Sequence, residues 1–220
     1  MTSAELPYEH SGIRYSICRP EEVAEMVSVL AETFARHDPP AVALGLTPAE
    51  FETFLTIVSA TAGEDGLTVV ARDLGSGSMA GALLNEDAGR PSELDLSAIS
   101  PRFEPIFDLF GEIEERIGDT GPIEPGTTLH VFMLAVGERF AGRGIAQRLV
   151  EVSLAQAVAL GYRTAVTEAT NLVSQHIFSK LGFVARAQAS YADYRRGGSA
   201  TFASIADQGG IMSMTRELPD

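Results

Sequence analysis

The stretch from residue 128 to residue 160 constrains the fold of this chain more than any other. Thr128–Val136 is apolar and rich in strand-forming residues, whereas residues 145–160 repeat apolar side chains at helical spacing. The turn between them is rich in glycine, so the chain is expected to leave backbone N–H groups free at the helix start, where an anion can bind. The stretch therefore predicts an anion seat, to which Arg139 and Arg143 could add charge-assisted contacts.

Two glycine-x-glycine patterns occur in this chain, and their surroundings distinguish them. With 21 glycines in 220 residues, such a pattern arises by chance and carries no information alone. Gly75 and Gly77 lie between two predicted strands and indicate a hairpin turn, whereas Gly142 and Gly144 lie between a strand and a helix. The second pattern lacks the third glycine of a dinucleotide fingerprint and the Gly-Lys-Ser/Thr of a P-loop, so neither of those motifs is present.

The remaining pattern predicts an α/β fold around a mixed sheet with parallel and antiparallel pairs. Pro39 and Pro40 are expected to break the first helix. Residues 86–100 and the glycine-rich stretch before residue 211 are expected as loops. Because there is no repeat and no linker long enough to divide the chain, residues 1–220 are expected to form a single domain. Strands are expected over residues 13–18, 67–73, 79–85, 128–136, 163–168, 183–191 and 211–216, and helices near residues 20–34, 48–58, 103–117, 145–160 and 173–181.

Charge and composition exclude several classes of partner. A formal net charge of −14, without basic runs, argues against nucleic acid and anionic membranes and permits cationic substrates such as amines. No apolar run has membrane-spanning length and no secretory signal is visible. The single cysteine, Cys18, fits a reducing cytoplasm, so a cytoplasmic protein is expected. His10, His37 and His176 lack ligand spacing, so no metal is expected, and the oligomeric state stays open.

A family resemblance is carried by the glycine-rich turn and two flanking elements. Arg139-x-x-Gly142-x-Gly144 resembles the acetyl-CoA motif Arg/Gln-x-x-Gly-x-Gly/Ala of the GNAT acetyltransferase superfamily. Leu134-Ala135-Val136 before it and Asn171…Lys180-Leu181-Gly182-Phe183 after it match the same family in order and spacing. The resemblance implies a GNAT fold over nearly all 220 residues and acetyl-CoA as the cosubstrate.

The resemblance also implies a path for the cosubstrate along the chain. The backbone of residues 134–136 would pair with the pantetheine arm, and the amides of residues 142–146 would hold the pyrophosphate. A backbone N–H at Leu134 or Ala135 would polarise the thioester carbonyl. The cofactor-binding residues predicted in this way are Leu134, Ala135, Val136, Arg139, Gly142, Arg143, Gly144, Ile145, Ala146, Asn171 and Phe178.

An alkylamine must lose a proton before it attacks, so a general base is expected. With a pKa of about 10.4, only about one amine in a thousand is neutral near physiological pH, and a positioned base is worth up to about 4 kcal/mol. His130 is one candidate, and it is expected to share a strand face with Phe132 and Leu134. Its strand resembles the His-Leu-His-x-Leu-Ala-Val strand of arylalkylamine N-acetyltransferases, with Phe132 in place of the second histidine. A half-buried histidine without a catalytic role is the alternative.

Asp38 is the other candidate base. The stretch that ends in Asp38-Pro39 resembles the Phe-x-x-x-Glu-Pro-Leu stretch of insect-type arylalkylamine acetyltransferases, in which the glutamate is the proposed base. The alternative is an aspartate that ends a helix before proline. Thr170 and Ser174 match hydroxyl positions that this branch uses near the CoA sulfur, although Ser174 could instead cap the next helix. Phe178 stands where many GNAT enzymes carry a tyrosine general acid, so Ser174, another hydroxyl or water would protonate the leaving thiolate.

The function expected from these residues is direct transfer of an acetyl group from acetyl-CoA to a primary amine. A small amine is favoured because residues 34–47 and the insertion at 86–127 could wall a compact pocket. One alternative is a protein N-terminus or lysine side chain, which would need an open groove. Another is a GNAT-fold sensor or interaction protein that binds CoA with little catalysis.

Overall fold

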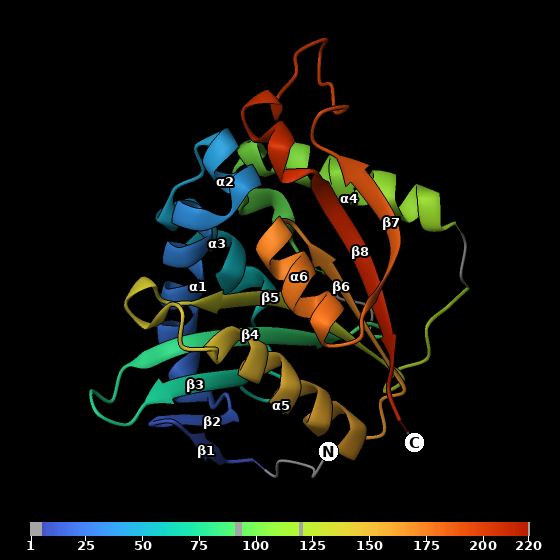
Figure 1. The fold of residues 1–220 in the computed structure, drawn as a ribbon. Coiled ribbons are helices and arrows are strands. Elements are labelled where there is room, and N and C mark those ends of the chain that lie inside the picture. Colours follow the sequence, from blue (N-terminus) through green and yellow to red (C-terminus); the bar gives the residue numbers. More distant parts are fainter. Residues whose placement is uncertain (1–5, 91–93, 119–120, 220) are drawn as a thin grey trace.

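The computed structural model describes residues 6–90, 94–118 and 121–219. These residues form one eight-stranded sheet with helices on both of its faces (Figure 1). The strands follow the order β1-β2-β3-β4-β5-β6-β8-β7 across the sheet, and all neighbouring pairs are antiparallel except β5 and β6, which run parallel. The predicted α/β fold with a mixed sheet is confirmed.

The bounds of the elements agree closely with the sequence pattern in the second half of the chain. The strands are β1 (Tyr8–His10), β2 (Ile13–Ile17), β3 (Val69–Asp73), β4 (Met79–Asp87), β5 (Thr128–Val136), β6 (Thr164–Ala169), β7 (Val184–Ser190) and β8 (Gly210–Glu217). The helices are α1 (Val23–His37), α2 (Pro39–Leu44), α3 (Pro48–Val58), α4 (Glu104–Ile117), α5 (Ile145–Ala159) and α6 (Leu172–Lys180).

Each face of the sheet has its own hydrophobic core. α5 and α6 cover the face turned toward the viewer in Figure 1, where Leu149 and Phe178 are buried. α1, α3 and α4 cover the opposite face, where Met26, Leu55 and Leu109 are buried. Among the described residues, no helix combines the length and the apolarity that are needed to cross a membrane.

The prolines after α1 do more than end that helix. α1 ends at His37, as predicted, because Asp38 takes an extended conformation (ψ 120°) before Pro39. A second helix, α2, then starts directly at Pro39, which the sequence analysis did not predict. Proline is tolerated at the first helical position because an N–H there would have no helical partner. Asp38 caps this helix by accepting a hydrogen bond from the Ala41 N–H at 3.4 Å.

Other short elements also differ from the predicted loops. β1 precedes the first predicted strand, and β4 extends two residues beyond the expected end. Short 3-10 helices lie at Leu96–Ala98, inside the first expected loop, and at Ala203–Gln208, between β7 and β8. These elements are too short to show a repeating apolar pattern, so their sequences gave no signal.

A bulge in β5 changes which of its side chains share a face. The pairing with β4 aligns Leu84 with Met133 but Asn85 with Val131, so Phe132 is the extra residue in β5. Phe132 packs against the core under α1 and α3, whereas Leu134 packs against the core under α5. The expectation that Leu134 shares a face with His130 and Phe132 is therefore wrong.

β5 and β6 separate after a short parallel contact. Their pairing covers only residues 128–130 of β5 and residues 164–166 of β6. Beyond it, the Thr167 hydroxyl donates to the Val131 carbonyl at 2.8 Å, and β5 continues beside β4 alone. The edge of β5 over residues 131–136 therefore faces a gap between two strands, where an extended ligand could add its own hydrogen bonds.

Candidate functional site

The turn between β5 and α5 has the geometry of the predicted anion seat. Gly142 and Gly144 both have a φ of 73°, in the left-handed region that favours glycine. The first hydrogen bond of α5 runs from the Arg148 N–H to the Gly144 carbonyl at 3.1 Å, so the N–H groups of residues 145–147 have no partner within the helix. A Cβ on either glycine would meet no atom within 4 Å. The space in front of these amides is open, and a phosphate can approach them closely.

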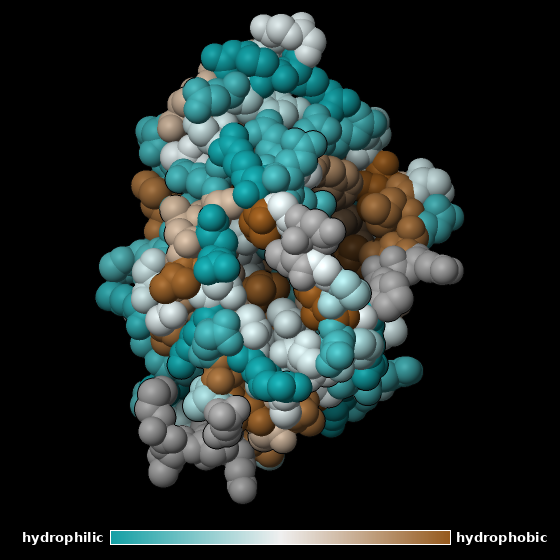
Figure 2. Space-filling view, turned by 90° about the vertical axis from the view of Figure 1, so that its right-hand side faces the viewer, coloured by the Kyte–Doolittle hydropathy of each residue, from teal (hydrophilic) through white to brown (hydrophobic). Residues whose placement is uncertain are grey.

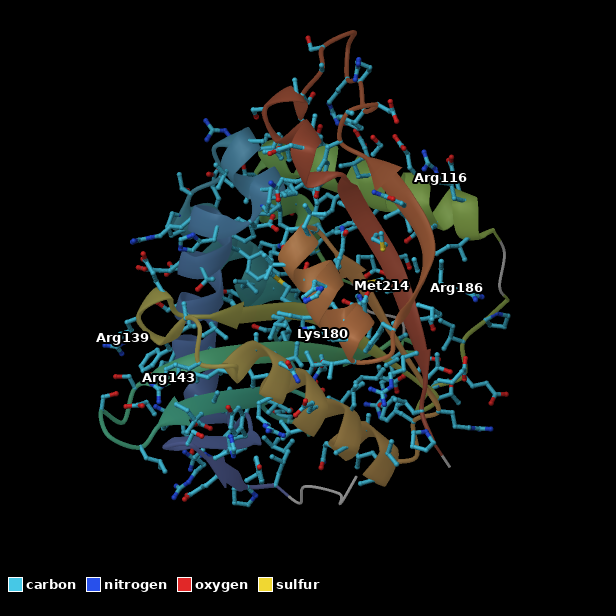
Figure 3. The ribbon with its side chains drawn as sticks, in the orientation of Figure 1. Arg116, Arg139, Arg143, Lys180, Arg186 and Met214 are labelled. Carbon is cyan, nitrogen blue, oxygen red and sulfur yellow. The ribbon has the colours of Figure 1, made fainter. Side chains whose placement is uncertain are left out.

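The two arginines of the turn, Arg139 and Arg143, differ in the ion pairs and hydrogen bonds that they already make. Both guanidinium groups lie over the ring of Phe140, Arg139 at 4.7 Å and Arg143 at 5.7 Å from the centroid. Arg143 also lies 3.4 Å from the Asp73 carboxylate and donates to the Ser11 carbonyl at 3.4 Å. Arg139 has no ion pair within the described ranges of the chain. Figure 3 shows both arginines at one edge of the molecule, beside the start of α5, so Arg139 is the freer cation for a phosphate.

A cavity of about 380 Å³ lies between the sheet and the helices α1, α3 and α4. Figure 2 shows hydrophobic side chains gathered around a hollow on one side of the molecule, at the height of α4. The predicted site residues Asp38, His130, Leu134, Asn171 and Ser174 all line this cavity, together with Phe178. Its walls are largely aromatic, and the rings belong to Phe34, Phe51, Phe54, Phe103, Phe107, Phe110 and Phe132.

Asp38 is a buried carboxylate that opens onto this cavity. It is 7% exposed and has no cationic partner within the described part of the chain. Its Oδ1 accepts a 2.5 Å hydrogen bond from the Thr170 hydroxyl, and its Oδ2 accepts from the Ala41 N–H. The Tyr191 hydroxyl in turn donates to the Thr170 carbonyl at 2.7 Å. Burial outweighs these two hydrogen bonds and raises the pKa of Asp38 to about 6.

This raised pKa predicts that Asp38→Asn stabilises the protein at alkaline pH. Because the folded-state pKa of Asp38 is about 6 rather than 3.8, the folded chain holds a proton that the unfolded chain has released, and stability falls as pH rises through that window. The amide carries no charge, and the Thr170 hydroxyl can turn to accept from it. We expect the free energy of unfolding at pH about 8 to rise by about 1–3 kcal/mol. Urea unfolding of the wild type and of Asp38→Asn at pH about 4 and about 8 measures the difference in their free energies of unfolding. This difference should be smaller at the acidic pH. A destabilised variant at pH about 8 would contradict the assignment.

His130 lies between two carboxylates of neighbouring strands. Its Nε2 is 2.8 Å from Glu168 Oε2 on β6, and its Nδ1 is 3.4 Å from Glu86 Oε2 on β4. Carboxylates only accept hydrogen bonds, so both ring nitrogens must carry a proton to satisfy both contacts. Burial opposes the charged ring, yet the two carboxylates raise the pKa of His130 to about 9. At neutral pH the side chain is therefore an imidazolium.

Asn171 and Ser174 lie at the start of α6, and the residue that caps this helix is not the one suggested by the sequence. Asn171, not Ser174, is the N-cap, because its Oδ1 accepts from the Ser174 N–H at 2.9 Å. The Ser174 hydroxyl donates to the Asn171 carbonyl at 2.9 Å. The suggestion that Ser174 could be the N-cap is therefore wrong, because the chain already enters the helix at residue 172. Phe178 is buried, with its ring edge-on to Phe183 at 5.1 Å.

Sequence reasoning missed Glu168 and Glu86 as site residues. Glu168 lines the cavity, and Glu86 binds the far side of the His130 ring. A signal was present for Glu168, because it is the one charged residue in the alternating strand β6. Within the described ranges, no group of three His, Cys, Asp or Glu side chains is arranged to hold a metal ion.

Comparisons with known proteins place this geometry. Residues 109–183 match the model of the acetyltransferase (GNAT) family. The C-terminal condensation domain of Ebony, in complex with beta-alanyl-dopamine, is 19% identical with a TM-score of 0.83, over 94% of this chain and 99% of that one. Arylalkylamine N-acetyltransferase 2 from Aedes aegypti is 23% identical with a TM-score of 0.77, and the match covers 94% of this chain and 99% of that one. The polyamine N-acetyltransferase of Drosophila melanogaster is 18% identical with a TM-score of 0.69, and the match covers 94% of this chain and 100% of that one.

The matched segment contains β5, the anion seat, β6 and α6, and so nearly all of the predicted cofactor site. The similar structures extend the likeness to almost the full chain at the level of the fold. Residues 109–183 therefore resemble the acetyltransferase (GNAT) family, and the chain has the GNAT fold.

Proposed function

We propose that this protein is an N-acetyltransferase that transfers the acetyl group of acetyl-CoA directly to a small primary amine. The observation that carries the proposal is the buried carboxyl of Asp38, with a pKa of about 6, at the wall of an aromatic cavity. A base with a pKa near the operating pH is suited to take a proton from an attacking amine. Two proteins of the same fold, named above, are N-acetyltransferases of arylalkylamines and of polyamines.

Acetyl-CoA fits the residues that the fold brings together. It would supply the acetyl thioester. The amides of residues 142–146, with Arg139 beside them, would hold its pyrophosphate. The free edge of β5 over Leu134, Ala135 and Val136 would pair with the pantetheine arm, and Asn171 and Phe178 would flank its tail. The open space in front of the glycines, in which a Cβ meets nothing within 4 Å, supports this placement.

Asp38 would act as the general base of the transfer. Above a pH of about 6 the carboxylate is ionised and accepts the amine proton as the nitrogen attacks the acetyl carbon. The new C–N bond forms, the C–S bond breaks, and the departing thiolate takes a proton. Thr170 fixes the carboxylate through its hydroxyl, and Ser174, which lines the same cavity, is the candidate donor for the thiolate.

His130 is kept as the second candidate base, with a different signature. Because its pKa is about 9, it would accept a proton only in alkaline solution. The pH at which activity rises therefore separates the two candidates.

The cavity also supports a small acceptor over a protein chain. α4 contributes Ile106, Phe107 and Phe110 to its wall, whereas a protein N-terminus needs an open groove. The perturbed carboxyl inside it favours catalysis over a role as a CoA sensor. We further propose that residues 1–220 act as a single domain, and that the free thiol of Cys18 fits a cytoplasmic setting.

A test of this proposal is release of CoA thiol from acetyl-CoA in the presence of a panel of primary amines. We expect amine-dependent release that saturates with at least one small amine, and an N-acetylated product of matching amount by mass spectrometry. A protein that binds CoA but releases thiol with no amine, and with no peptide N-terminus, would favour the sensor.

A further inference from the structure

We infer that the acceptor amine carries a second positive charge, which Glu168 binds inside the cavity with His130 and Glu86 as its support. This inference rests on the proposed function, because it names the class of amine that the same cavity takes. It would make Glu168 a residue that determines specificity and has no part in the chemical step.

Besides Thr33, His37 and Glu114 on the helices, the cavity has polar groups in two separated places on its sheet side. One place contains Asp38, Thr170 and Ser174, beyond the end of β6. The other contains His130 and Glu168, nearer the start of the β5–β6 gap. Aromatic and aliphatic side chains form most of the remaining wall. A ligand that fills such a cavity needs an apolar middle and a polar group at each end, because buried polar groups without partners are costly.

The charge around His130 decides which polar group fits the second place. Its ring contacts two carboxylates, and both contacts require N–H donors, so the cluster combines two negative charges with one positive charge. The only ion pairs of Glu86 and Glu168 within the described ranges are those with His130. The cluster thus carries a net charge of −1, and its members His130 and Glu168 line a cavity with aromatic walls. A neutral tail, even a hydroxylated one, would leave that charge uncompensated, whereas an ammonium or guanidinium group neutralises it.

Glu168 has a free oxygen for such a group. Its Oε2 is used by His130 at 2.8 Å, and in the described part of the chain its Oε1 has no hydrogen-bond partner. The side chain is partly exposed and lines the cavity. The neighbouring ring of Phe132, 5.1 Å from that of His130, adds a π face of the kind that attracts cations.

The spacing of the two places sets the length of the acceptor. Glu168 and Thr170 are two residues apart along the chain, an offset of about 7 Å for extended backbone, although β6 itself ends at Ala169. An extended chain of about five methylene groups between two nitrogens spans this distance. A diamine of that length would place one nitrogen near Asp38 and the other near Glu168.

The experiment compares pentamethylenediamine with hexylamine, which has a methyl group where the diamine has its second ammonium. We expect kcat/KM for the diamine to exceed that for hexylamine at least tenfold, or about 1.4 kcal/mol. Glu168→Gln should reduce this ratio toward one. Glu115→Gln, on an exposed part of α4 outside the cavity, should leave the ratio unchanged. Equal kcat/KM for both amines, or a ratio that survives Glu168→Gln, would overturn the inference.

A second pair of amines and a binding measurement separate the other outcomes. One outcome is that the kcat/KM for tyramine exceeds that for phenethylamine in the wild type but not in Glu168→Gln, while the kcat/KM values for the diamine and hexylamine are equal. In that case Glu168 binds a phenol and the inference is wrong. Calorimetry with the CoA-bound protein compares the affinities of pentamethylenediamine and hexylamine without turnover. Preferential binding of the diamine without any thiol release would contradict the proposed function and support the charge recognition.

Discussion

Asp38→Asn is expected to lower kcat/KM about 10²-fold or more near neutral pH, the usual range for loss of a general base. The amide cannot accept the amine proton, so the variant depends on the small fraction of amine that is already neutral. Its activity should therefore recover as pH rises toward the pKa of the amine. In the wild type, kcat/KM should rise with pH through about 6, the pKa of Asp38, because only the carboxylate form is a base. A pH–rate series with one amine measures both effects.

Two other variants make this series decisive. Asp95→Asn removes an aspartate that likewise caps a short helix, but it is exposed and lies outside the cavity, so its profile should match the wild type. His130→Ala tests the other base. If His130 is the base, that variant carries the pH-dependent loss, and the wild-type rise occurs near its pKa of about 9. If both Asp38→Asn and His130→Ala keep near-normal activity from about pH 6 to about pH 9, neither residue is the base. The rate would then come from the proximity of the two substrates and from the backbone N–H that polarises the thioester carbonyl.

Two carboxyl groups that line the cavity, those of Asp38 and Glu168, have different surroundings. Asp38 has hydrogen-bond donors but no cation, so burial dominates and its charged form is disfavoured. Glu168 instead has an ion pair, with its Oε2 2.8 Å from His130 Nε2. This difference would assign proton transfer to Asp38 and charge recognition to Glu168.

The strand, turn and helix of the predicted cofactor site could be located from the sequence because their signals are local, whereas the binding of acetyl-CoA there stays a prediction. β5, the glycine turn and α5 are consecutive, and each has a strong pattern of its own within about 30 residues. Asp38 was a candidate because the stretch that ends in Asp38-Pro39 resembles the Phe-x-x-x-Glu-Pro-Leu stretch of insect-type arylalkylamine acetyltransferases. Its pKa could not be predicted, because it depends on burial and on Thr170, which is 132 residues away along the chain.

The His130 cluster was out of reach for a related reason. Glu86, His130 and Glu168 lie on three strands, and they meet only through the register of β4 with β5 and of β5 with β6. A bulge such as that at Phe132 shifts register by one residue without any sign in the alternating pattern. α2 was missed because two prolines usually end a helix, although they can also begin one.

Gly144→Glu is expected to abolish the rise in melting temperature that acetyl-CoA produces in the wild type. A ligand at a hundred times its Kd stabilises the folded state by about 2.7 kcal/mol, so the shift is large enough to measure. The new side chain would add a negative charge in front of amides that the phosphates need, at a φ of 73° that favours glycine. Gly144→Ala carries the same backbone strain without the charge and should keep part of the shift. Gly75→Ala, in the hairpin between β3 and β4, should keep all of it. An unchanged shift in Gly144→Glu, or a tenfold loss of affinity in Gly75→Ala, would show that the phosphates bind elsewhere.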